Sequence, residues 1–306
     1  MWLVFVLYAL FASVFTVAKG ALEYTAPFFL VGSRMMIAGL LMLGYAAWRR
    51  PKSLHLNRSA LIRIGLLGFF SIYLTNVLEL WGLKYLTSFK TCFLYSLSPF
   101  LSALFSYFII KERLSFQKAV GLSIGFLGLW PMLASQGRNE LLTGTLFGFS
   151  GAEAAVLCAV ISSVLGWIFL QQLVRDDGCA PGVANGYSML LGGFLALIQS
   201  ACFESWAPLP ITDYGVWAES TLFLIIVSNL ICYNLYGHLL KTFSPTFMAF
   251  AGLSTPLFTA LFGWIFHHEV VTPAFFLSLA VVFLGLLVFY FEEIRAKEPQ
   301  GAATLR

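Results

Sequence analysis

Five ionisable residues lie inside long apolar stretches of this 306-residue sequence. They are Arg34, Glu79, Lys90, Glu153 and Glu219. A charge within a bilayer is costly, so such residues usually face a partner or a water-filled cavity and mark a solute pathway. Lys90, Glu79 and Glu219 lie near the ends of their stretches, where they could instead reach the interface. Arg34 and Glu153 could instead form a structural ion pair. The presence of both cationic and anionic residues predicts a charged or zwitterionic solute. Glu79 and Glu219 are candidates for ion coupling or for an outer vestibule.

A second group of polar residues in these stretches is uncharged. Asn229 and Tyr233 are four residues apart and are expected to share one face of a helix. We expect them to line the pathway, with Asn76 and Tyr95 opposite. Hydrogen bonding between packed helices is the alternative role for such side chains. The predicted substrate-binding residues are therefore Arg34, Asn76, Lys90, Tyr95, Glu153, Asn229 and Tyr233.

One motif could suggest catalysis. Gly148–Gly151 reads GFSG, similar to the nucleophile motif of rhomboid-type intramembrane proteases. Such a protease needs a histidine base near Ser150, and none of the four histidines is placed at that depth. The segment after His268 also lacks the second histidine of a zinc HExxH motif. We expect no catalytic residue, metal or cofactor, and an intramembrane serine protease is the disfavoured enzymatic alternative.

Composition places the chain in a membrane. It is 59% hydrophobic and 10% charged, with a mean hydropathy of +0.86, whereas a soluble domain is usually about a quarter charged. The net charge of +4 comes with no long basic run, so nucleic acid is not an expected partner. The five cysteines lack metal-type spacing. An all-α integral membrane protein follows, because helices satisfy their backbone polar groups internally in lipid.

Ten stretches are long and apolar enough to cross a bilayer, which takes about 20 residues. They cover residues 2–19, 27–48, 60–83, 87–110, 116–135, 143–170, 183–203, 214–239, 244–266 and 273–291. With the N-terminus inside, the outer loops hold Lys19, Lys84 and Arg138, and most other cations are cytoplasmic. The positive-inside rule therefore predicts a multi-pass protein of the bacterial inner (plasma) membrane with both termini cytoplasmic. In this orientation all five charges fall in the outer half.

The sequence contains an internal repeat. Residues 99–129 align without a gap with residues 256–286, and Pro99, Glu112 and Gly128 match Pro256, Glu269 and Gly285. Each half then has five spans, and an odd number forces the second half to be inverted. The predicted parts are a first repeat over 1–138, a second over 139–292 and a cytoplasmic tail over 293–306. Inverted repeats are typical of transporters.

The doubled pattern resembles a known family. A mid-span proline, a run of small apolar residues, a glutamate at the helix end and then FLGL are similar to the EamA branch of the drug/metabolite transporter superfamily. The resemblance covers nearly the whole chain. It implies a central cavity between the halves, with the fifth and tenth spans at the periphery. The combination of abundant aromatic residues and intramembrane charges also resembles that of the S-adenosylmethionine carriers of intracellular bacteria in this superfamily.

We expect a secondary transporter, because the sequence has no GxxxxGK[ST] phosphate-binding loop. Mixed charges favour an amino-acid-like zwitterion, and the aromatic residues suit a solute that carries a ring. S-adenosylmethionine has both features, and its sulfonium could contact aromatic faces. Candidate stacking residues are Phe93, Tyr95, Trp167 and Tyr187. Uptake or exchange is the main expectation and export of amino acids or drugs the alternative, by a monomer or homodimer whose partners are the solute and the bilayer.

Overall fold

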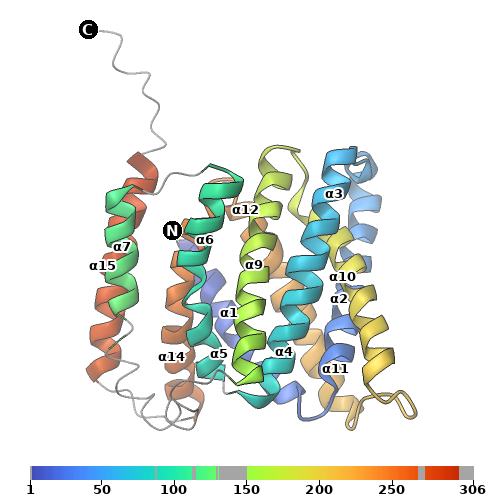
Figure 1. Ribbon diagram of the computed structural model, residues 1–306. Coiled ribbons are helices and arrows are strands. Elements are labelled where there is room, and N and C mark those ends of the chain that lie inside the picture. Colours follow the sequence, from blue (N-terminus) through green and yellow to red (C-terminus); the bar gives the residue numbers. More distant parts are fainter. Residues whose placement is uncertain are drawn as a thin grey trace.

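The computed structural model describes residues 2–86, 88–111, 115–128, 130, 150–267 and 273–295. Within these ranges the chain is helical, and the extended pairing consists of one isolated bridge between Thr25 and Ile211. The helices stand side by side along a common direction (Figure 1). The all-α prediction is confirmed for this part of the chain.

Six helical stretches are long and apolar enough to cross a membrane. They are α1 (Trp2–Ala21), α2 (Pro27–Arg49), the stretch Arg58–Tyr85, α9 (Gly151–Arg175), α10 (Pro181–Phe203) and the stretch Tyr214–Leu239. Two shorter apolar helices are Ser98–Ile109 and Phe276–Glu292. Large apolar side chains such as Phe108, Phe203 and Phe291 are exposed on the bundle. That exposure suits a surface in contact with lipid.

Two of the long stretches change to π-helix at their centres. The first runs through α3 (Arg58–Leu67), the π segment η2 (Gly68–Leu74) and α4 (Thr75–Tyr85). The second runs through α11 (Tyr214–Phe223), the π segment η3 (Leu224–Cys232) and α12 (Tyr233–Leu239). A π turn bonds residue i to i+5 and rotates every later side chain relative to a regular α-helix.

Two other stretches are broken near the matched prolines. The first is divided into α5 (Ser88–Tyr95) and α6 (Ser98–Ile109), and the second into α13 (Pro245–Ala251), the 3₁₀ turn η4 (Gly252–Ser254) and α14 (Thr255–His267). Pro99 and Pro256 are each the second residue of the new helix. Proline suits a helix start, where its missing N–H removes no intrahelical bond.

The remaining helices in the described ranges are η1 (Pro51–Leu54), α7 (Phe116–Gly128) and α15 (Pro273–Arg295). Helices α7 and α15 pack together at one edge of the bundle, on the left in Figure 1. A Cβ added to Gly285 would lie 2.7 Å from the backbone nitrogen of Gly125, so only glycine permits this approach. Small residues of this kind let membrane helices pack closely. The repeated FLGL glycine therefore has a packing role.

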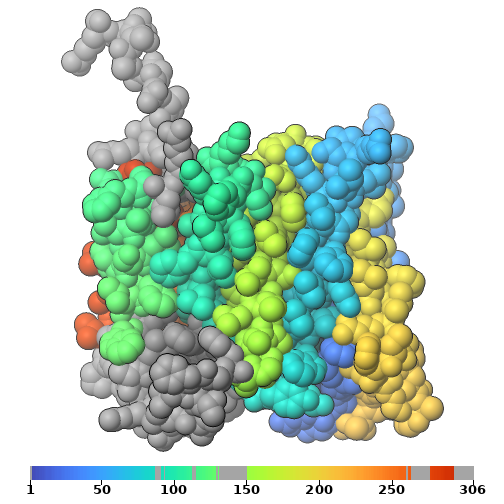
Figure 2. All heavy atoms as spheres, in the orientation of Figure 1, coloured from blue at the N-terminus to red at the C-terminus, as the bar shows by residue number. Residues whose placement is uncertain are grey.

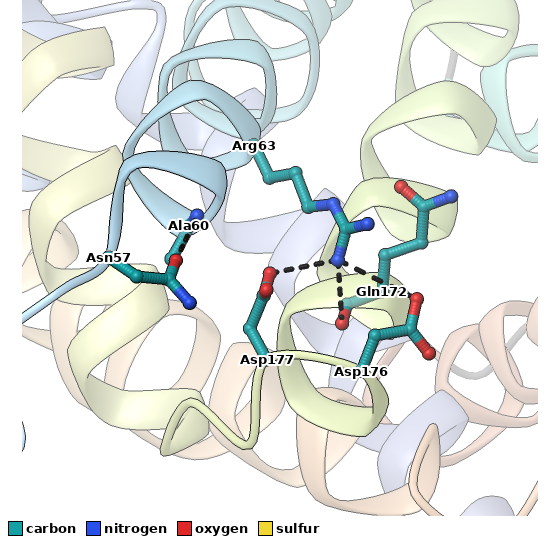
Figure 3. A network of polar contacts seen from close by, with 6 residues as sticks. All are labelled: Asn57, Ala60, Arg63, Gln172, Asp176 and Asp177. Atoms are coloured by element: carbon teal, nitrogen blue, oxygen red, sulfur yellow. Dashed lines mark hydrogen bonds and ion pairs between the residues drawn. The ribbon is translucent and has the colours of Figure 1, made fainter.

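An ionic network joins α3 to the C-terminal end of α9 (Figure 3). Arg63 Nη1 lies 2.8 Å from Asp177 Oδ2 and 3.6 Å from Asp176 Oδ2. The same nitrogen lies 3.4 Å from the Gln172 carbonyl oxygen.

The space-filling view shows side chains of α6, α9 and the α3–α4 stretch in contact along the face turned toward the viewer (Figure 2).

The loops before α2 and after α10 are fastened to each other. The Ala26 N–H donates to the Pro210 carbonyl at 3.1 Å, and the Thr212 N–H donates to the Tyr24 carbonyl at 2.8 Å. The carboxylate of Glu204 accepts from the N–H groups of Phe28 and Phe29 at 2.8 and 2.9 Å. A carboxylate at this position satisfies orphan donors at the start of α2.

Candidate functional site

A cavity of about 130 Å³ lies among the helices in the described part of the chain. Its walls come from α1, α2, the η2–α4 segment, α5, α6, α9, the η3–α12 segment and the α13–α14 break. It therefore lies where both π segments and both broken helices meet. Its polar lining includes Arg34, Asn76, Glu79, Tyr95 and Tyr233.

Arg34 is the buried cation of this cavity. Its side chain projects from α2 and the residue is 2% exposed. Arg34 Nη2 donates to Asn76 Oδ1 at 2.6 Å. Its Nε and Nη1 have no hydrogen-bond partner among the described residues. A buried guanidinium with two free donors provides a strong binding position for an anion.

Asn76 is oriented by the π segment that precedes it. Its Nδ2 lies 3.0 Å from the Ser71 carbonyl oxygen and 2.9 Å from that of Ile72. The same nitrogen lies 3.1 Å from the Tyr233 hydroxyl. With its nitrogen held in this way, the amide presents its oxygen to Arg34. Asn76 thus links the guanidinium to the opposite wall of the cavity.

Glu79 supplies the negative charge of the cavity. It lies three residues after Asn76 on α4, on the same helix face, and is half-buried. The Tyr95 hydroxyl donates to its carboxylate. The Tyr95 ring contacts Phe15 edge-on, with ring centroids 5.8 Å apart. In the described part of the chain, no ion pair within 4.0 Å joins Glu79 to Arg34.

Aromatic rings form another part of the wall. Trp167 stacks on Tyr236, with ring centroids 4.0 Å apart and planes 23° apart. Tyr233 lies 5.3 Å from Trp167 between centroids. The Tyr8 hydroxyl donates to the Met248 carbonyl. Through Tyr233, this wall is continuous with the polar groups around Asn76.

The structure brings together five of the nine predicted site residues: Arg34, Asn76, Glu79, Tyr95 and Tyr233. Glu79, for which an interfacial position was the alternative, lines the cavity. Trp167 lines it as well, whereas the Tyr187 hydroxyl lies 3.5 Å from the Leu54 carbonyl. The side chains of Lys90 and Phe93 lie outside the described residues.

Asn229 is placed differently from Tyr233. It is fully buried, and its Nδ2 lies 2.8 Å from the Met35 sulfur and 3.8 Å from the Met189 sulfur. It does not line the cavity. The reason is the π segment η3, which contains Asn229 and ends just before Tyr233. A spacing of four residues does not give a shared face across a π turn.

Glu153 and Glu219 lie in the opening turns of their helices. Glu153 is the third residue of α9, where it forms a capping box with Ser150. The Ser150 N–H donates to Glu153 Oε2 at 2.7 Å, and the Glu153 N–H donates to Ser150 Oγ at 3.2 Å. Glu219 is exposed on α11. The GFSG serine is therefore a helix cap in this structure.

Tyr8 and Tyr236 also line the cavity, although they are not among the residues predicted from sequence. Tyr236 follows Tyr233 by three residues within the regular helix α12, so helical spacing could have identified it. Tyr8 lies in an apolar stretch with no other polar residue near it, and the sequence around it contains no comparable signal.

A bundle of apolar helices around a cavity with a buried Arg34 and a half-buried Glu79 is typical of a polytopic membrane transporter. The chain matches the model of the EamA-like transporter family over residues 1–134 and 150–291, and it belongs to that family. The resemblance inferred from the repeated proline, glutamate and FLGL motifs is thus confirmed. The protein is a transporter and not an enzyme.

Several relatives are similar over nearly the whole length. The S-adenosylmethionine/S-adenosylhomocysteine transporter of Chlamydia muridarum (strain MoPn / Nigg) is 37% identical over 296 residues, which cover 96% of this chain and 92% of the relative. The transporter of the same name from Chlamydia trachomatis serovar L2 is also 37% identical, over 96% of this chain and 90% of its own. A solved protein structure that is 19% identical superposes with a TM-score of 0.72, covering 97% of each chain. That similarity establishes the fold alone.

Proposed function

We propose that this protein is a secondary transporter of S-adenosylmethionine and S-adenosylhomocysteine, working by uptake or exchange. The observation that carries the proposal is one cavity that combines a buried guanidinium, a carboxylate and a wall of aromatic rings. Both solutes carry an α-carboxylate, which suits the guanidinium, and a planar adenine, which suits the aromatic rings. S-adenosylmethionine also carries a sulfonium, whose positive charge suits the carboxylate. The name and the 37% identity of the chlamydial relatives support the same solute pair.

We further propose ten membrane spans in two inverted halves, residues 1–138 and 139–292, followed by a tail over 293–306. Asn76 and Tyr233 are 157 residues apart, which is the offset of the sequence repeat, and they contact each other at 3.1 Å. Equivalent residues that touch lie near a two-fold axis. The π segments also fall at equivalent positions, and α2 packs on α10 as α7 packs on α15. These features support a site at the repeat interface.

The orientation that we propose places both termini in the cytoplasm of a bacterium. In that orientation the cavity charges lie in the outer half of the membrane, and Lys90, Glu153 and Glu219 are candidates for an outer vestibule. Asn229 remains a candidate that would contact the solute only after η3 moves.

The cavity of about 130 Å³ is smaller than the roughly 300–1,000 Å³ of typical ligand sites. Solute binding therefore requires the helices to separate, and the broken and π-helical segments are where such movement would occur.

Transport by purified protein in proteoliposomes tests the proposal. We expect saturable uptake of labelled S-adenosylmethionine that internal S-adenosylhomocysteine accelerates. Methionine, adenosine and other amino acids serve as comparison solutes, each measured with and without a pH gradient. Absence of saturable transport of both named solutes would overturn the proposal. Movement of amino acids or drugs alone would support the alternative of an exporter.

A further inference from the structure

We propose that Glu79 distinguishes S-adenosylmethionine from S-adenosylhomocysteine, whereas Arg34 binds the carboxylate that both solutes share. This inference rests on the proposed function. The two solutes differ by a methyl group and by the positive charge of the sulfonium. A site that accepts both therefore needs one common anchor and one group that responds to this extra charge.

Arg34 has the properties of the common anchor. The residue is 2% exposed, and its Nε and Nη1 lack partners among the described residues. Removing such a cation from water without a counter-ion is costly, so an arriving carboxylate restores both charge balance and hydrogen bonds. Asn76 accepts from Arg34 Nη2 at 2.6 Å and fixes the direction of the guanidinium. This group responds equally to the two solutes, because both carry the same carboxylate.

Glu79 has the properties of the discriminating group. A sulfonium has no hydrogen to donate, so proteins can recognise it only by electrostatic attraction and by contact with aromatic faces. The carboxylate of Glu79 already accepts from the Tyr95 hydroxyl. Its charge remains available to a cation that brings no hydrogen-bond donor. The Phe15 and Tyr95 rings, with centroids 5.8 Å apart, provide aromatic surface beside it.

The two charges are available separately. No ion pair within 4.0 Å joins Arg34 to Glu79 in the described ranges. Arg34 Nη2 donates to Asn76, and the Glu79 carboxylate accepts from the hydroxyl of Tyr95 in α5. Were the guanidinium and the carboxylate paired directly, neither would respond to the ends of a solute. Their separation across one cavity suits a solute whose carboxylate and sulfonium lie several bonds apart.

The test compares inhibition constants in proteoliposomes. Uptake of labelled S-adenosylhomocysteine is inhibited with each unlabelled solute, for the parental protein and for Glu79→Gln. The variant should weaken inhibition by S-adenosylmethionine about tenfold or more and change inhibition by S-adenosylhomocysteine less than about threefold. Glu292→Gln, on α15 and away from the cavity lining, is the matched control and should leave both constants unchanged.

Two further variants keep the test decisive. Glu79→Asp retains the charge and should retain the preference for S-adenosylmethionine. If Glu79→Gln fails to insert, Tyr95→Phe removes only the hydroxyl that holds the carboxylate, and the preference should fall by a smaller factor. Equal loss of both solutes in Glu79→Gln overturns the inference, and so does an unchanged ratio of the two constants in Glu79→Gln or, where that variant does not insert, in Tyr95→Phe. Failure of the parental protein to transport either solute counts instead against the proposed function.

Discussion

At the residue scale, the cavity depends on side chains that hold one another. Arg34 is buried in α2 and is bonded to Asn76, and Asn76 in turn lies within 3.1 Å of the Tyr233 hydroxyl. A chain of such bonds fixes each member more firmly than a single contact would. The guanidinium is therefore preorganised, and changes in its geometry should affect binding even where its charge is kept.

Replacing Arg34 by lysine tests this preorganisation. Lysine keeps the positive charge but lacks the planar set of donors that a carboxylate matches. One charge-assisted hydrogen bond contributes about 1.5–3 kcal/mol, so the affinities for both solutes should fall together, by about tenfold to a hundredfold. Inhibition constants in proteoliposomes measure the loss. A selective loss of one solute would contradict the role of Arg34 as the shared anchor.

Ser150 offers a second prediction at this scale. Because its side chain caps α9, Ser150→Ala should lower the free energy of unfolding by about 1 kcal/mol and leave the KM for transport unchanged. Thermal unfolding in detergent and proteoliposome uptake measure the two quantities. Ser150 lies in the GFSG motif, so an unchanged transport rate also separates its capping role from any role as a nucleophile.

At the element scale, the Arg63 network connects α3 to the end of α9. Asp177 is 9% exposed and 2.8 Å from the guanidinium, whereas Asp176 is 60% exposed and 3.6 Å away. Removing one partner of a buried pair leaves an uncompensated charge, whereas exposed pairs contribute little. Asp177→Ala should therefore destabilise the protein by about 1–3 kcal/mol and Asp176→Ala by less than about 0.5 kcal/mol.

Thermal or denaturant unfolding of the two aspartate variants provides the comparison, with Arg63→Ala and the double variant Arg63→Ala/Asp177→Ala completing a cycle. The double variant should lose less than the sum of its parts, because both single changes remove the same interaction. Additive losses, or equal effects of Asp176 and Asp177, would show that the network does not join these helices.

The elements also show how far the sequence could predict this structure. Hydropathy identifies the long helices, because an apolar run of about 20 residues has one stable form in lipid. It does not identify the π segments, because a π turn depends on how helices pack and leaves no periodic mark. For this reason the four-residue spacing did not predict that Tyr233 lines the cavity while Asn229 turns toward Met35. Sequence identifies Glu79 as a candidate for coupling or an outer vestibule, but its hydrogen bond from Tyr95 of α5 depends on tertiary packing that the sequence does not reveal.

At the scale of the whole molecule, helices from the N-terminal and C-terminal parts of the chain pack against each other. Helix α9 packs on α3, η2 and α4, and α1 packs on α11, η3 and α12. The family model likewise matches residues 1–134 and 150–291. In transporters built from repeats, alternating access moves one repeat against the other. The direction of transport then depends on which end of the bundle faces the cytoplasm.

That orientation can be measured with cysteines placed at opposite ends of α2. Glu23 is exposed just before α2, and Lys52 is exposed just after it. The positive-inside rule predicts a cytoplasmic Lys52. A membrane-impermeant maleimide should therefore label Glu23→Cys in intact cells and Lys52→Cys only after permeabilisation. The exposed native thiols, Cys158 and Cys202, are first changed to serine, and this parent should remain unlabelled. Labelling of Lys52→Cys alone from outside would reverse the orientation and place Arg34 and Glu79 in the inner half of the membrane.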